Sequence, residues 1–180
     1  MKTFTTEAIV IKRKNYNEAD RILTVFAKKH GKLSIKASGV RKITSRRSAH
    51  IELLNHTLLT VYKNNGMPVL TEAQSLNTYS DIKRSLSRIG YAYHLCELVD
   101  SLCPENQENE YVYALLLDML DKLSKEEYVS LLVKKFEIEL LTALGFYSPQ
   151  FAAQHFDSSL FIEDILEKRL KAIKIIPQFS

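Results

Sequence analysis

The chain has 180 residues, 46% hydrophobic and 26% charged, a composition that is typical of a globular protein and excludes a disordered one. Its net charge of +4 conceals an asymmetry. Residues 1–50 carry thirteen Lys or Arg against three acids, whereas residues 51–180 carry twelve against eighteen. An excess of positive charge in one part of a chain predicts a surface for a polyanion there, with a different and acidic remainder.

The N-terminal segment, MKTFTTEAIV, lacks the long apolar core and the small-residue cleavage site of a signal peptide. No apolar run approaches the length of a membrane span, and two cysteines are too few for a disulfide framework. We therefore expect a cytoplasmic protein that makes no contact with a membrane.

Short segments rich in β-branched and apolar residues predict five strands before residue 80. They cover residues 7–13, 21–27, 31–37, the second half of 51–63, and 67–73. A polar loop at 15–20, a turn at Gly31 and an Asn-Asn-Gly turn at 64–66 separate some of them. Close spacing with one longer connection predicts a small closed barrel. The oligonucleotide-binding (OB) fold is the first candidate, and an SH3-like or other small barrel is the alternative.

From about residue 80 the apolar residues recur at helical spacing. These stripes predict helices over 89–103, 112–123, 129–144 and 162–173. Ser124 to Glu127 has the pattern of a capping box that would open the third of them. The sequence thus predicts an α+β protein, with a five-stranded OB-fold barrel in residues 1–79 and an all-helical domain in residues 80–180.

The most basic stretch runs from Gly31 to Arg47, GKLSIKASGVRKITSRR, and contains no acid. Its first half alternates apolar and basic residues, as a strand with one basic face does, and its second half is a basic loop that begins near Gly39. A solvated surface loop is one interpretation, and contact with the phosphates of a nucleic acid is the other, which the charge asymmetry favours. The candidate phosphate-binding residues are Arg13, Lys14, Lys32, Lys36, Arg41, Lys42, Arg46 and Arg47.

Two neighbouring residues each have two interpretations. Tyr16 is either a platform for stacking on a base or a tyrosine packed in a loop. Arg21 is basic as well, but Glu18 and Asp20 could neutralise its charge.

No motif predicts catalysis, because the chain has no Walker-type phosphate loop, no paired carboxylates and no nucleophile elbow. Cys96 and Cys103 share a helix face, with His94 nearby, yet a structural zinc site needs four ligands. Buried core cysteines are the better interpretation. We expect a non-enzymatic binding protein without a metal or cofactor.

Four segments together resemble the bacterial recombination mediator family RecO, in the family's order and spacing from about residue 7 to residue 149. They are EAIVIKRKNYNEADRILTVFAKKHGKL, ASGVRKITSRR, IGYAYHLCELVDSL and FEIELLTALGFYSP. The resemblance implies an OB fold joined to a helical domain and the binding and annealing of DNA, both single- and double-stranded. It also implies work with RecR to load RecA onto strands coated by single-stranded DNA-binding protein, in the nucleoid.

The chain departs from the family after Pro149, where many members carry a four-cysteine zinc site. No cysteine follows Cys103, so we expect the zinc module to be missing and the helical domain to be reduced. Two other functions stay open: an RNA chaperone, because OB surfaces also bind RNA, and a protein-interaction adaptor whose barrel charge steers an acidic partner.

Overall fold

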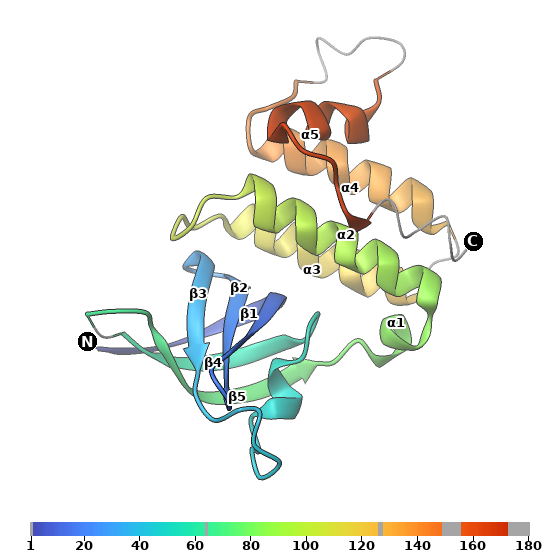
Figure 1. Ribbon diagram of the computed structural model, residues 1–180. Helices are drawn as coiled ribbons and strands as arrows, with labels where there is room; N and C mark the ends of the chain where they lie inside the picture. Colours follow the sequence, from blue (N-terminus) through green and yellow to red (C-terminus); the bar gives the residue numbers. More distant parts are fainter. Residues whose placement is uncertain (1, 64, 126–127, 149–155, 173–180) are drawn as a thin grey trace. The chain divides into compact units, whose positions relative to one another are not determined.

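The computed structural model describes residues 2–63, 65–125, 128–148 and 156–172 (Figure 1). The chain divides into two compact units. The first unit contains Met1–Tyr79 and Pro104–Tyr113, and the second contains Ser80–Cys103 and Ala114–Ser180. The sequence analysis assigned 104–113 to the helical domain, but the structure places this segment with the strands. Its three acids, at 105, 108 and 110, therefore lie in the basic unit.

Five strands build the first unit, and Figure 1 shows them from blue to green. They are β1 (Thr3–Tyr16), β2 (Asp20–Ala27), β3 (Gly31–Ala37), β4 (His56–Tyr62) and β5 (Val69–Asn77), with a short 3-10 helix, η1 (Ser48–Ile51), before β4. Most neighbouring strands pair antiparallel, and one parallel pair, Lys36 with Val69, joins β3 to β5. The order β1-β2-β3-β5-β4 closes into a barrel. The predicted α+β layout with five strands is confirmed.

Strand β1 is longer than the predicted 7–13 because it pairs on both sides. It pairs with β4 over residues 3–9 and with β2 over residues 8–16, and a bulge between Val10 and Lys12 shifts the register against β2. A bulge bends a strand, so one strand can follow two sides of a small barrel. Asn15 and Tyr16, which were predicted to lie in a loop, therefore belong to the β1–β2 ladder.

The predicted alternation in β3 is confirmed. Leu33, Ile35 and Ala37 are buried in the barrel core. They join apolar residues from all the other strands and from the segments that connect them, among them Val10, Leu23, Val25, Val40, Ile51, Leu59, Val61 and Leu70. Burial of such side chains stabilises the barrel by about 1.5–3 kcal/mol each. The residues between them point to the outer face, where the candidate basic residues of β3 lie.

The helices are α1 (Ser80–Arg84), α2 (Leu86–Leu102), α3 (Glu110–Lys125), α4 (Val129–Ala143) and α5 (Ser158–Leu166). Helix α2 packs against α4, and α4 packs against α5. None of the helices in the described ranges is long and apolar enough to cross a membrane.

The helix termini correct two predictions. Ser124 lies inside α3 and its hydroxyl donates to the Asp121 carbonyl at 2.7 Å, so it does not open the next helix, and Glu127 lies outside the described residues. Helix α5 begins at Ser158, earlier than predicted, because Asp157 Oδ1 accepts hydrogen bonds from the backbone at N2 and N3. The end of the predicted 162–173 helix also lies outside the described residues.

Candidate nucleic-acid interface

The basic loop, residues 38–47, is held against the turn between β1 and β2. Gly39 turns the chain at φ +69°, and its N–H donates to Asp20 Oδ1 at 2.8 Å. The Arg41 N–H donates to the carbonyl of Ala19 at 2.9 Å. The Gly39 N–H, followed by the Lys36 ammonium at 3.1 Å, holds the pKa of the Asp20 carboxyl below its usual value. The start of the loop is thus fixed by backbone and ionic contacts.

Basic side chains from two strands and this loop converge at the same end of the barrel. In the strand register Lys14 lies opposite Ile22, which lies opposite Lys36, so both lysines occupy one row on the outer face. Arg41 reaches the β1–β2 turn, where its Nη1 donates to the Asn17 carbonyl at 3.1 Å. We define the basic surface as Lys14, Lys36, Arg41, Lys42 and Arg46; all are exposed except Lys36, which is half-buried.

Tyr16 ends β1 beside the basic surface. Its side chain is 44% exposed, and the Lys36 ammonium lies 5.6 Å from the centroid of its ring. A lysine at this distance is attracted to the face of an aromatic ring. The tyrosine is therefore held at the edge of the basic surface, and its use as a base-stacking platform stays a prediction.

Arg47, predicted to contact phosphates from a solvated loop, is half-buried and bonded to the barrel's own backbone. Its Nη1 donates to the Leu70 carbonyl at 2.7 Å and its Nη2 donates to the Ser38 carbonyl at 2.8 Å. The guanidinium thereby ties both ends of the basic loop to β5. No local pattern predicts this role, because the carbonyl lies 23 residues away in the sequence and every residue type carries a backbone carbonyl.

We expect Arg47→Ala to lower the free energy of unfolding by about 1–2 kcal/mol, because two carbonyls lose a charged donor. Arg46→Ala should leave stability nearly unchanged, since Arg46 is exposed. Chemical denaturation of both variants measures the difference. Equal stability of Arg47→Ala and the unsubstituted protein would contradict the structural role.

Lys32 does not lie on an accessible basic face, contrary to the prediction. Only 8% of it is exposed. Its backbone bridges to Glu105, and its carbonyl accepts the Asn106 N–H at 2.9 Å. The Ser34 hydroxyl, in turn, donates to Glu105 Oε1 at 3.3 Å. The acidic segment 104–113 thus lies beside the N-terminal half of β3, and Glu105 brings negative charge to the outer face there.

Arg13, another predicted phosphate-binding residue, also lies away from the outer basic face. The bulge in β1 moves it to the inner side of the strand, opposite Leu23, at the mouth of the barrel. There Arg13 Nη1 lies 2.5 Å from Glu52 Oε2, and Arg21 Nη1 lies 3.5 Å from Glu52 Oε1. Glu52 therefore offsets one of the two positive charges of this pair, whereas the sequence analysis named Glu18 and Asp20 as the acids that could neutralise Arg21.

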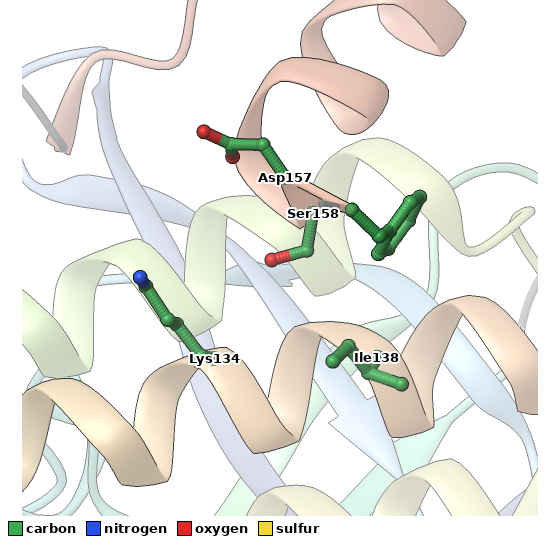
Figure 2. Close-up of a pocket in the computed structure, with 5 residues that line it drawn as sticks. Lys134, Ile138, Asp157 and Ser158 are labelled. Atoms are coloured by element: carbon green, nitrogen blue, oxygen red, sulfur yellow. The ribbon is translucent and has the colours of Figure 1, made fainter. Parts of the chain in front are cut away.

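A pocket of 290 Å³ in the second unit is a weaker candidate (Figure 2). Lys134 and Ile138 of α4 face Asp157 and Ser158 across it. Asp157 caps α5, and the Ser158 hydroxyl donates to Glu137, so the internal structure already uses two of its polar groups. The pocket is small for a ligand site.

Sequence reasoning missed a buried polar network next to this pocket. Glu137 of α4 is 1% exposed, and its Oε1 lies 2.6 Å from His94 Nε2 of α2. Its other carboxylate oxygen accepts the Ser158 hydroxyl of α5, and Ser159 donates to both oxygens. The serines donate to the glutamate rather than to the histidine, so this is no nucleophile–base arrangement. The network joins three helices.

Both cysteines are buried, which confirms their interpretation as core residues. Burial raises the pKa of the Cys96 thiol to about 12, so the thiolate that reacts or binds metal is scarce at neutral pH. Across the described ranges, no three His, Cys, Asp or Glu side chains are grouped to hold a metal ion.

Comparison with known proteins decides the family. Residues 1–79 match the profile described as "Recombination protein O N terminal", and residues 83–154 match "Recombination protein O C terminal". The chain belongs to the RecO family. It is 37% identical over 149 residues to a "DNA repair protein RecO" of Roseiflexus sp. (strain RS-1) and 36% identical over 150 residues to one of Acetivibrio thermocellus.

These alignments cover 83% of this chain but only 52% and 59% of the two relatives. A third relative, from Pelotomaculum thermopropionicum, is 32% identical, with 81% of this chain and 57% of the relative aligned. The chain thus spans little more than half the length of the RecO proteins that it matches. The family profile continues to residue 154, beyond Pro149, after which the sequence analysis expected a departure from the family; residues 149–155 lie outside the described residues.

Proposed function

We propose that the first unit is an OB fold and that its basic surface binds DNA through the phosphates. The observation that carries this proposal is the convergence of five cationic side chains, from β1, β3 and the basic loop, at one end of a closed five-stranded barrel. OB folds bind oligonucleotides on the face of strands 2 and 3 and on adjacent loops. The repair function in the relatives' names supports DNA as the polyanion.

Each cation that contacts a phosphate releases condensed counterions, which supplies affinity without base specificity. A surface that holds one strand by its phosphates leaves the base edges free to pair with a second strand. The protein therefore anneals complementary strands by positioning them, without a chemical step. Three candidates are left out of this proposed surface: Lys32 is only 8% exposed, Arg13 is paired with Glu52 on the inner side of β1, and Arg47 bonds the carbonyls of Leu70 and Ser38.

The proposal extends to partners through the family. The protein binds single- and double-stranded DNA, and acts with RecR and single-stranded DNA-binding protein to load RecA during repair. It works in the cytoplasm, at the nucleoid, as a non-enzymatic mediator.

Annealing of two complementary oligonucleotides by the purified protein tests the proposal, with strands bare or coated by single-stranded DNA-binding protein. We expect faster annealing than the spontaneous rate in both cases. Competition between DNA and RNA of equal sequence tests the RNA-chaperone alternative, which predicts preference for RNA. An adaptor predicts weak binding to bare DNA at every salt concentration and no annealing.

A further inference from the structure

The tip of the basic loop carries a fully exposed isoleucine. The Ile43 side chain is 105% exposed. The Lys42 N–H donates to the Gly39 carbonyl at 3.2 Å and the Ser45 N–H to the Lys42 carbonyl at 2.9 Å, so two successive turns present it. Gly, Pro, Asn, Asp and Ser dominate turns for backbone reasons, and isoleucine has no such advantage. The local fold thus does not account for this residue.

The base of the loop is fixed although its tip is exposed. Gly39 is bonded to Asp20 at one end, and Arg47 bonds to Ser38 and β5 at the other. The side chain of Ile43 is therefore presented from an anchored loop. Its nearest charged neighbours in sequence are all cations: Arg41, Lys42 and Arg46. This positive charge favours one kind of partner for Ile43, a polyanion that also has apolar surface. An apolar groove on another protein is the less suitable partner.

We propose that Ile43 is a base-contacting wedge, an inference that rests on the proposed DNA binding. When the cations of the loop hold the phosphates, Ile43 enters between neighbouring bases and separates them. Apolar side chains such as isoleucine do this in proteins that unstack base steps. A fully exposed side chain gains the most from such burial, and the contact depends on the faces of the bases rather than on their sequence.

The chain has no tryptophan, so Ile43→Trp supplies a single tryptophan at the proposed contact, whose emission can be followed apart from that of the tyrosines. We expect a single-stranded oligonucleotide to quench its emission strongly, by stacking on the indole. Leu86→Trp is the matched control, because Leu86 is an exposed apolar residue of the helical unit with 62% exposure. Its emission should change little.

Ile43→Ser supplies a second measurement. It should weaken binding to a single strand about fivefold, because one apolar contact is lost, without altering the salt dependence. On an abasic oligonucleotide of equal length, which keeps the phosphates, the variant and the unsubstituted protein should bind equally. Thr44→Ser, at the next turn position, should behave as the unsubstituted protein on both ligands.

Equal responses of the two tryptophans, or an unchanged affinity of Ile43→Ser, would overturn the inference while leaving DNA binding intact. A blue shift of Ile43→Trp with phosphatidylglycerol vesicles but no response to DNA would overturn it in favour of a membrane surface. Failure of the unsubstituted protein to bind DNA would instead refute the proposed function, and the wedge with it.

Discussion

Glu137→Ala is expected to destabilise the helical unit by about 3–5 kcal/mol, because the buried polar groups of His94 and Ser158 each lose their hydrogen-bond partner, at about 1–3 kcal/mol for each group. The change leaves His94 and Ser158 buried without the carboxylate that joins them. It also cuts the polar link between α2, α4 and α5. Thermal unfolding followed by circular dichroism should show a fall in melting temperature of more than about 10 °C.

Glu139→Ala is the matched control on the same helix. Glu139 forms only an exposed pair with Lys135, four residues earlier, at 3.7 Å. Such pairs contribute about 0.3–0.5 kcal/mol, so the melting temperature should barely move. Glu137→Gln should give an intermediate loss, because the amide keeps one acceptor oxygen where the carboxylate has two. Equal effects of the two alanine substitutions would contradict a structural role for the buried network.

Gly31→Ala is expected to destabilise the barrel unit by about 3 kcal/mol, from left-handed backbone strain and overpacking together. Gly31 adopts φ +64°, and an added Cβ would lie 1.8 Å from the Gln107 carbonyl oxygen. The methyl group therefore requires the 104–113 segment to move away from β3. Because Asn106 is bonded to Lys32 at 2.9 Å, that movement breaks the bridge along the strand edge.

Gly39→Ala separates the two causes. Gly39 has a similar φ of +69°, but nothing lies within 4 Å of an added Cβ. Its substitution should cost only about 1 kcal/mol, the backbone strain alone. Chemical denaturation of both variants, monitored by tyrosine fluorescence, gives the comparison. Similar losses would mean that the 104–113 segment does not pack against Gly31.

The local sequence pattern was sufficient to predict a strand or helix, and its core residues, wherever one face of that element is buried. The alternation in β3 placed Leu33, Ile35 and Ala37 in the core, and the helical stripes located α2, α3 and α4 to within a few residues. Burial imposes a period on a strand or helix, and a period is visible in a single sequence. The α+β layout followed from the change of period near residue 80.

Contacts between residues far apart in the chain could not be predicted, because they produce no local sequence pattern. Arg47 looked identical to Arg46, yet one bonds two carbonyls and the other is exposed. The 104–113 segment, rich in Asn and Glu, has the composition of a loop, and its place beside β3 depends on residues about seventy positions earlier in the chain. Glu137 has the residue type of a solvated helix face, and only the fold brings His94 to it.

The salt dependence of DNA binding tests the basic surface most directly. Each phosphate contact with a single strand contributes about 0.7 to the slope of log affinity against log salt. If Lys42 and Arg46 each hold a phosphate, the double variant Lys42→Ala/Arg46→Ala should flatten the slope by about 1.4, equally for two unrelated sequences. Lys134→Ala/Lys135→Ala, which removes two exposed cations from α4, should leave it unchanged. An unaltered slope in the Lys42/Arg46 variant would contradict DNA binding at this surface.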